Sequence, residues 1–387
     1  MDKPYNGLRV IDFSTTIAGP QCTRMLADMG ADVIKIEALE GDMMRSRPPQ
    51  RNGASTAFGQ LNAGKRSVVI DLKSAAGREA ARRLAASGDV VVENFRPGVM
   101  QRLGLDYQTL RADNPGLIYC AISGYGQTGP SSQLPAYAPV IHAASGFDLA
   151  HLDYQEGRER PDYCGIFVAD VLSGVYAFGA IGTALHHRSR TGAGQFIDVS
   201  MLESMLSLTL TELQAAQFPF TMPRRPMYGP VETGDGYVMV AVASEKTFLN
   251  LLDAAGQPEL ARDPRFEKYL DRRANWAELM DLIENWSRGL TRDQCLQALE
   301  QHGVPSSPYR SVKQALDDPQ LVHRQALAQV SDRGGVFNAL NPPFRFSETA
   351  VGAGSHAAAL GEHTREVLRE IGYDDAAIAG LRERGII

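Results

Sequence analysis

The alternation of short apolar strands with helices in the first 125 residues most constrains the fold of this chain. Runs rich in β-branched residues, such as LRVIDF (8–13) and DVVVENF (89–95), are apolar almost throughout, as strands are when both faces of a sheet are covered. Helical patterns follow at 19–30 and 75–88. This order predicts an α/β fold, a doubly wound, Rossmann-like sheet that is largely parallel and has helices on both faces. The other predicted strands of this half are 31–37, 67–72 and 116–126.

The pattern changes twice further along the chain. A long helix from Asp170 to about His187 leads into a short strand at 196–199. Proline-rich stretches then flank a middle segment of different texture, and proline favours extended connections over continued helices. The prediction is a large α/β domain at 1–200, a linker at 201–225, a small α+β domain at 226–310, and at 311–387 a second linker with C-terminal helices that return to the large domain.

Charge and composition exclude several function classes. The net charge of −6 argues against nucleic acid as a partner, and the apolar runs contain Gly, Ser or charge before they reach the roughly 18–20 residues of a membrane span. Residues 1–20 lack a basic leader followed by an apolar stretch, so no secretory signal is expected. The four cysteines are scattered without metal-ligand spacing, which favours reduced thiols in the cytoplasm and no metal site.

The turn after the first predicted strand is a natural place for a ligand. STTIAGPQC (14–22) puts the start of a helix at the carboxyl end of a strand, where backbone N–H groups attract anions. The turn has one glycine and a proline rather than G-x-G-x-x-G, so nicotinamide and flavin binding are not expected. Basic residues near other strand ends either hold a polyanion, such as the phosphates of coenzyme A, or are solvated loop charges; they are Lys65, Arg66, Lys73, Arg96 and Arg102.

A single acid, Asp170, interrupts the small and apolar segment YCGIFVADVLSGVYAFGAIGTAL (163–185). A carboxylate buried without a partner is unfavourable, so this residue needs an explanation. It is the N-cap of the following helix, a buried structural acceptor, or a nucleophile or base in a dry site. Its small neighbours are expected to leave room for a substrate; they are Gly165, Ala169, Ser173, Gly174 and Ala177.

No other catalytic group stands out in the sequence. The cysteines have no recognisable partner histidine, and no G-x-S-x-G nucleophile elbow occurs. Of the eight histidines only His186 and His187 are adjacent, and neighbours on a helix point in different directions. Asp170 therefore stays the candidate for the chemical centre.

Seven blocks of the chain together resemble the family III CoA-transferases, the group that contains formyl-CoA transferase, carnitine CoA-transferase and the α-methylacyl-CoA racemases. Each block alone is a weak signal, but they occur in the family's order and span nearly the whole chain. The blocks are GLRVIDFSTTIAGPQCTRMLADMGADVIKIE, LNAGKRSVVIDLK, VVENFRPGVMQRLGLDY, ISGYGQTGP, IFVADVLSGVYA, RSRTGAGQFIDVSMLES and LGEHTREVL.

The resemblance implies a covalent mechanism. Asp170 matches the family's catalytic aspartate, which attacks the thioester of an acyl-CoA donor. A mixed anhydride and then an aspartyl-CoA thioester form, and an acceptor acid takes the CoA by the reverse sequence. Coenzyme A is then a substrate, and no tightly bound cofactor is expected. The resemblance also implies an interlocked homodimer, in which the small domain of one subunit reaches the active site of the other.

Matching positions carry the family's coenzyme A contacts over to this chain. Ala38 stands where some members place an arginine beside adenine, so that contact is expected from Arg45 or Arg47. Ile17 lies in the loop near the thioester, and Tyr137 matches an active-site tyrosine of the formyl-CoA branch. The positions that match contacts to pantetheine and phosphates are Ile70, Lys73, Asn94, Phe95 and Arg102.

Departures from the family pattern narrow the expected activity. Ala138 replaces an acid of the formyl-CoA branch, and only Gly234 and Gly236 stand for that branch's run of glycines, so oxalate–formate exchange is not expected. Racemase members have a His-Asp dipeptide where this chain has Tyr137 and Ala138, and His142, five residues later, is judged too far away to replace it. We expect a CoA-transferase with a succinyl-CoA donor and a short dicarboxylate acceptor. A racemase of the same family and a non-catalytic coenzyme A-binding protein are the alternatives.

Overall fold

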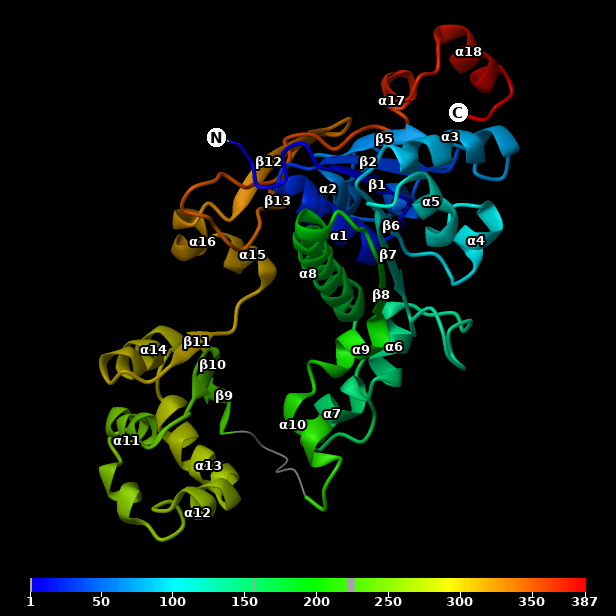
Figure 1. Cartoon of the computed structure of the whole chain (residues 1–387). Helices are drawn as coiled ribbons and strands as arrows, with labels where there is room; N and C mark the ends of the chain where they lie inside the picture. The colour runs from blue at the N-terminus through cyan, green and yellow to red at the C-terminus, as the bar shows by residue number, and fades with distance from the viewer. Residues whose placement is uncertain (1, 156, 221–226) are drawn as a thin grey trace. The chain divides into compact units, whose positions relative to one another are not determined.

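The structure, a computed structural model, describes residues 2–155, 157–220 and 227–387 (Figure 1). The chain forms two compact units. The first consists of Met1–Asp148, Asp162–Leu213 and Gln320–Ile387, and the second of Leu149–Pro161 and Gln214–Pro319. Residues 221–225 of the predicted linker lie outside the described residues.

A six-stranded sheet with all neighbouring strands parallel forms the centre of the first unit. Its order is β5-β2-β1-β6-β7-β8, so the chain builds from β1 to one edge and then from β6 to the other. This is the doubly wound, Rossmann-like order, and it confirms the predicted fold class. The strands are β1 (Arg9–Asp12), β2 (Asp32–Glu37), β5 (Arg66–Val69), β6 (Val90–Glu93), β7 (Ile118–Ser123) and β8 (Phe196–Ser200).

Helices cover both faces of this sheet (Figure 1). Successive strand residues point to opposite faces, so Ile11 and Val91 enter one core while Val10 and Val90 enter the other. Because both faces are covered, apolar residues follow one another in these strands rather than alternating with polar ones, as in VVV of β6. One face carries α3 (Ala75–Ala86), α5 (Tyr107–Asp113), α17 (Thr364–Glu370) and α18 (Asp375–Glu383), and the other carries α1 (Ala18–Asp28), α6 (Ala138–Ala144), α8 (Val168–Thr191) and α9 (Met201–Leu206).

Helix α8 packs along α1 through small side chains. A Cβ atom on Gly174 would lie 2.6 Å from the carbonyl oxygen of Ala18, so only glycine allows this approach. Farther along α8, Gly182 lies against the hydroxyl of Tyr5, whose backbone N–H donates to the carbonyl of Met29 just after α1 ends. The two helices therefore run in the same direction, and their first turns lie at the same end.

Helix α8 is also the one helix of the described residues that is long and apolar enough to cross a membrane, by length and composition only. This differs from the expectation that Gly, Ser and charge interrupt every apolar run. Gly and Ser occur in α8, but its many alanines and large apolar residues keep its mean hydropathy high. About a third of this helix is buried in the first unit, along the face that carries Ala169, Gly174 and Ala177.

The second unit has its own core around a three-stranded antiparallel sheet of order β11-β10-β9. A turn at Gly234 and Asp235 joins β9 (Tyr228–Thr233) to β10 (Gly236–Ala241), and β11 is Ser306–Pro308. The helices α11 (Glu245–Ala254), α13 (Trp276–Ser287) and α14 (Arg292–Gln301) contribute apolar residues to this core.

Two further segments belong to the first unit. The hairpin of β12 (Leu327–Asp332) and β13 (Gly335–Leu340) lies there, and α17 and α18 bury Val367 and Ile378 in its core. Helices α9 and α10 (Leu210–Ala215) occupy part of the predicted linker 201–225.

The order of the sheet reverses between β1 and β6, which are neighbours. The connections from their carboxyl ends leave in opposite directions, and doubly wound proteins bind ligands in the crevice that opens there, the switch point. The loops after these two strands carry Ile17 and Asn94. They are therefore the natural position for a site in this unit.

Candidate active site

The loop between β1 and α1 has its backbone fixed by side chains from other strands. The N–H of Thr15 donates to Oδ1 of Asn94, and Nδ2 of Asn94 donates to the carbonyl of Thr15, both at 2.8 Å. The N–H of Thr16 donates to both carboxylate oxygens of Asp42, at 3.2 and 3.3 Å. Side chains that follow β6 and β2 thus hold two consecutive peptide groups of the loop.

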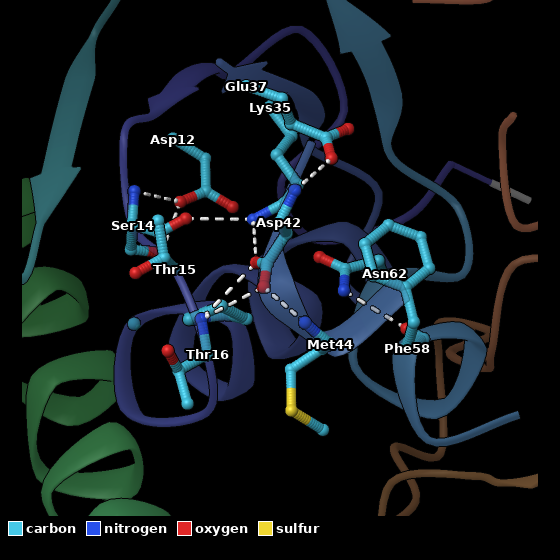
Figure 2. Close-up of polar contacts among 12 residues, drawn as sticks. Asp12, Ser14, Thr15, Thr16, Lys35, Glu37, Asp42, Met44, Phe58 and Asn62 are labelled. Carbon is cyan, nitrogen blue, oxygen red and sulfur yellow. Dashed lines mark hydrogen bonds and ion pairs between the residues drawn. The ribbon is translucent and has the colours of Figure 1, made fainter. Parts of the chain in front are cut away.

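Two buried ion pairs lie beside this loop, and Figure 2 shows the one between Lys35 and Asp42. Lys35, 1% exposed, pairs with Asp42 at 3.0 Å and donates to the carbonyl oxygen of Ser14 at 2.8 Å. Lys65 pairs with Asp12 at 3.1 Å, and Asp12 accepts the N–H of Ser14 at 2.9 Å. Burial alone would raise the pKa of Asp12, but the two lysines outweigh it and lower that pKa. Burial alone would lower the pKa of Lys35, but the nearby carboxylates outweigh it and raise that pKa. Asp12 and Lys35 are therefore both charged.

Thr16 carries the conformational strain of the loop. Its φ of +68° lies in the left-handed region, which a β-branched residue rarely adopts, and Asp42 holds its amide in that conformation. Helix α1 begins directly after Ile17, which supplies no side-chain cap. Pro20 has no N–H, so the N–H groups of this helix start are those of Ala18 and Gly19. Together with the positive end of the helix dipole they suit a developing negative charge at the switch point.

Asp170 lies in the first turn of α8 and has no ion pair among the described residues. Burial raises the pKa of its carboxyl from 3.8 to about 6. The N-cap of α8 is Phe167, so the interpretation of Asp170 as the N-cap is wrong. One turn later, on the same face of α8, Gly174 touches Ala18 at the start of α1. Because the helices run in the same direction, Asp170 and the fixed loop lie at the same end of the two helices.

The small residues around this acid serve helix packing rather than substrate access. Ala169, Ser173 and Ala177 are fully buried, and Gly174 is closed off by a backbone carbonyl of α1. The prediction that these four residues leave open room is therefore wrong, because the space beside them is filled by α1 and the sheet. Gly165, which precedes α8, is exposed and has nothing within 4 Å of its Cβ position.

Four predicted coenzyme A contacts lie just after strands of the central sheet. Asn94 follows β6 and is bonded to the β1–α1 loop, and Ile17 of that loop is 6% exposed. Ile70 and Phe95, which follow β5 and β6, pack in the same apolar core. The structure therefore brings Asn94 next to the loop of Ile17. Ile70 is fully buried and its N–H donates to the carbonyl of Glu37, so a contact of this residue with coenzyme A stays a prediction.

The other predicted contacts are exposed or already engaged. Lys73, after β5, and Arg102, in α4 (Val99–Leu103), are exposed, and Tyr137 is 67% exposed just before α6. The coenzyme A contacts of Lys73 and Arg102 and the substrate contact of Tyr137 stay predictions. Arg45 is a different case, because its guanidinium already has partners within the protein.

Arg45 donates to both carboxylate oxygens of Glu37, at 2.6 and 2.7 Å, and to the carbonyl of Ala358 at 3.1 Å. It also lies over the ring of Phe58, with 3.8 Å from Cζ to the ring centroid. A guanidinium held in this way has few donors left for adenine or phosphate. Of the two arginines expected beside adenine, the exposed Arg47 therefore suits that role better.

A cavity of about 490 Å³ adjoins the β1–α1 loop that carries Thr16. Its lining includes the apolar side chains of Met43, Phe58 and Leu360 and the cation Arg333. The hydroxyl of Thr16 donates to Sδ of Met43 at 3.5 Å, so Met43 separates the cavity from the strained loop. The size and mixed lining of the cavity suit part of a nucleotide-sized ligand.

Glu93 is a second buried acid at the switch point. It ends β6, is 5% exposed and accepts the N–H of Phe95 at 2.8 Å. Burial raises the pKa of Glu93 to about 8. The hydrogen bond from Phe95 opposes this shift, and the nearby charge of Asp198 adds to it. Glu93 is therefore largely protonated at pH 7, which makes it a poor nucleophile there.

Sequence reasoning missed the buried ion pairs, although a signal for them was present. Asp12 and Lys35 directly follow pairs of apolar residues within predicted buried strands, and buried charges need partners. Opposite charges in two neighbouring strands therefore indicate pairing. Their further partners, Lys65 and Asp42, lie in loops whose positions depend on the folded structure.

Comparison with known proteins gives these features a family context. The model of CoA-transferase family III matches residues 5–364. The chain is 34% identical over 385 residues to the succinate–glutarate CoA-transferase of Agrobacterium fabrum, with 95% of this chain and 96% of that protein covered. It is also 34% identical over 398 residues to the succinyl-CoA–D-citramalate CoA-transferase of Chloroflexus aurantiacus, with 100% and 98% covered.

A solved structure has the same architecture. The crystal structure of a CAIB/BAIF family protein from Brucella suis matches with a TM-score of 0.84 and 34% identity. The match covers 96% of this chain and 100% of that chain. It agrees with the α/β fold predicted from the alternating strands and helices.

Proposed function

The chain belongs to CoA-transferase family III and is an enzyme, and we propose that it moves coenzyme A from succinyl-CoA to a small carboxylic acid through a covalent intermediate on Asp170. The observation that carries this proposal is the position of Asp170, a partly buried acid without a cationic partner among the described residues, at the shared end of α1 and α8. The donor is proposed from the relatives, since one of them is named for succinyl-CoA.

In the proposed reaction, a carboxylate oxygen of Asp170 attacks the carbonyl carbon of the donor thioester. The C–S bond breaks, CoA leaves as the thiolate, and Asp170 and the donor acyl group form a mixed anhydride. The thiolate then attacks the carbonyl carbon of Asp170, releases the donor carboxylate and leaves an aspartyl-CoA thioester. The acceptor carboxylate repeats these steps in reverse and regenerates the free carboxylate of Asp170.

The loop before α1 has a proposed part in each addition step. Each attack on a carbonyl carbon creates an oxyanion, and uncapped N–H groups at a helix start can stabilise it. The loop that leads into α1 is fixed by Asn94 and Asp42, so its donors need little reorganisation during the reaction. The burial that raises the pKa of Asp170 also limits water, which would hydrolyse the anhydride.

The proposed acceptor is a short dicarboxylic acid. The names of the two relatives refer to glutarate and D-citramalate, both of which carry two carboxylates. The test is to incubate the protein with succinyl-CoA and a panel of acids of differing length and charge, and to detect new thioesters by mass spectrometry. We expect short dicarboxylates to react fastest; reaction with bulky acids alone would contradict this acceptor class.

Two further measurements, proton exchange and sensitivity to hydroxylamine, separate the proposed function from its two alternatives. A racemase would exchange the α-proton of a 2-methylacyl-CoA with deuterated water and would need no acceptor acid. A non-catalytic coenzyme A-binding protein would bind the ligand but form no adduct sensitive to hydroxylamine. Formation of a new thioester without α-proton exchange supports the transferase.

The rate should fall in acid as Asp170 becomes protonated. Attack needs the ionised carboxyl, and the pKa of that carboxyl in the folded protein is raised to about 6. With saturating donor and acceptor we expect a plateau above about pH 7, half of the plateau rate near pH 6, and a loss that approaches tenfold per pH unit below about pH 5. Initial rates between about pH 4.5 and 8 test this, with enzyme returned to pH 7 as the control for unfolding. A rate that stays constant down to pH 5 would contradict the assignment.

The proposal includes a homodimer whose subunits interlock, with residues 1–200 binding coenzyme A and residues 226–310 reaching the partner's active site. Apolar side chains left exposed around the start of α8 support a covering partner; they are Ile166, Phe167, Val171, Val175 and Tyr176. Light scattering from nanomolar to micromolar concentration should show a dimer throughout, and an active monomer would exclude interlocking. No tightly bound cofactor, metal, nucleic acid or membrane takes part in this proposal, and its expected location is the cytoplasm.

A further inference from the structure

His142 lies against the first turn of α8. It belongs to α6, which packs with α8 on the same face of the sheet. The side chain is 1% exposed, and its Nε2 accepts the backbone N–H of Ala169 with 3.2 Å between the nitrogens. Ala169 directly precedes Asp170 in the helix. An imidazole from another helix therefore holds a peptide group next to the proposed nucleophile.

This hydrogen bond supplies a cap that α8 itself lacks. The first N–H groups of a helix have no partner inside the helix, and a side-chain oxygen at the N-cap usually accepts one of them. The N-cap of α8 is Phe167, whose side chain has no acceptor. His142 takes over that role for Ala169, the second residue of the helix.

The geometry requires a neutral imidazole. Nε2 accepts a hydrogen bond only without a proton, so the ring proton lies on Nδ1, which is buried and has no partner in the part of the chain that the structure describes. Burial lowers the pKa of His142 while Asp148 opposes that shift, and the ring of Phe147 lies 5.9 Å away. With both ring nitrogens inside the protein, His142 is not placed to remove a proton from a substrate.

We propose that His142 is a positioning residue, which fixes the first turn of α8 so that the carboxyl of Asp170 stays aligned for attack. This inference rests on the proposed role of Asp170. It gives His142 a function other than that of a racemase base. Small displacements of a nucleophile can lower a rate about 100-fold, so loss of this bond should appear in kcat.

Three variants test the proposal in the full-length protein. His142→Leu keeps a similar apolar volume but removes the acceptor, and His142→Gln returns an oxygen at nearly the reach of Nε2. His142→Asn is a polar variant that is too short to reach Ala169, and it replaces the leucine variant if that one fails to fold. We expect kcat to fall about 10–100-fold in His142→Leu and His142→Asn, with KM for succinyl-CoA within about threefold of wild type, and to recover to within about threefold in His142→Gln.

Hydrogen exchange of the peptide that contains Ala169 gives a readout independent of catalysis. Its amides should exchange at least about tenfold faster in His142→Leu or His142→Asn than in wild type or His142→Gln, even if the panel of acids shows no transfer. Unchanged exchange and unchanged kcat in the variants without an acceptor would overturn the proposal. Equal loss of kcat in His142→Gln would also overturn it, since that result would demand an imidazole. Absence of transfer by the wild type, with exchange still dependent on residue 142, would overturn only the proposed function.

Discussion

Replacement of Asp170 by alanine is expected to abolish CoA transfer, with a fall in kcat of at least about 10⁴-fold. The carboxyl is the proposed attacking group, and alanine cannot form the anhydride or the thioester. Glu93 is not expected to replace it, because burial raises the pKa of Glu93 to about 8 and keeps it largely protonated at pH 7. Initial rates with succinyl-CoA and the fastest acceptor, followed by mass spectrometry, measure this effect.

Asp170→Asn distinguishes loss of chemistry from loss of fold. The pKa of Asp170 is raised from 3.8 to about 6, so its ionised form is disfavoured in the folded state and destabilises the protein at pH 7. The asparagine variant should therefore be inactive and more stable than wild type, by up to about 3 kcal/mol. Asp113→Asn, which changes an exposed acid paired with Arg82, is the matched control and should keep wild-type rates. More than a tenth of wild-type activity in Asp170→Ala would contradict the mechanism.

Replacement of Lys35 by methionine is expected to lower the free energy of unfolding by about 3–5 kcal/mol. Methionine keeps much of the apolar stem but removes the charge that pairs with Asp42 and faces Asp12, both of which are buried. Removal of the lysine leaves these two carboxylates buried with less positive charge nearby to stabilise them. The carbonyl of Ser14 also loses its hydrogen bond, so folded variant protein should show a lower kcat as the β1–α1 loop relaxes.

Chemical denaturation followed by circular dichroism measures the stability change. Arg82→Met is the matched control, because it removes one side of an exposed ion pair with Asp113 on the same unit. Its unfolding midpoint should not change measurably. A Lys35→Met midpoint within error of wild type would show that the buried ion pairs contribute little to the fold.

The doubly wound fold could be predicted because its main cause is visible in the sequence. A strand covered on both faces carries consecutive apolar residues, and the runs at 8–13, 31–37 and 89–95 contain such stretches. The helix start at 18 was also visible, and it lies at the switch point once the strand order is known. The family's sequence blocks then supplied Asp170 as the candidate nucleophile.

The ion pairs could not be predicted in full because they depend on which strands become neighbours. Asp12 faces Lys35 across the β1–β2 ladder, a register that only the folded sheet defines. Lys65 and Asp42 reach the same place from loops. The charged residues inside apolar strands were visible, but their partners were not.

Two features of the site depend on distance in space, which the sequence does not give. The prediction that His142 cannot replace the His-Asp dipeptide of the racemases stays a prediction, but its contact with Ala169 was not foreseen, because it depends on the packing of α6 beside α8. The small residues of α8 were interpreted as open space. They are where α1 packs closely, because a glycine at 174 lets the carbonyl of Ala18 approach.

The aspartyl-CoA intermediate distinguishes the proposed mechanism from all alternatives, and it can be trapped on Asp170. The wild-type protein would be incubated with succinyl-CoA without an acceptor, treated with hydroxylamine, digested and analysed by mass spectrometry. We predict a hydroxamate on Asp170 in the peptide that contains it, and none in Asp170→Asn protein treated in the same way. Continued CoA transfer with Asp170 unmodified, or a hydroxamate on another acid such as Glu93, would contradict the account.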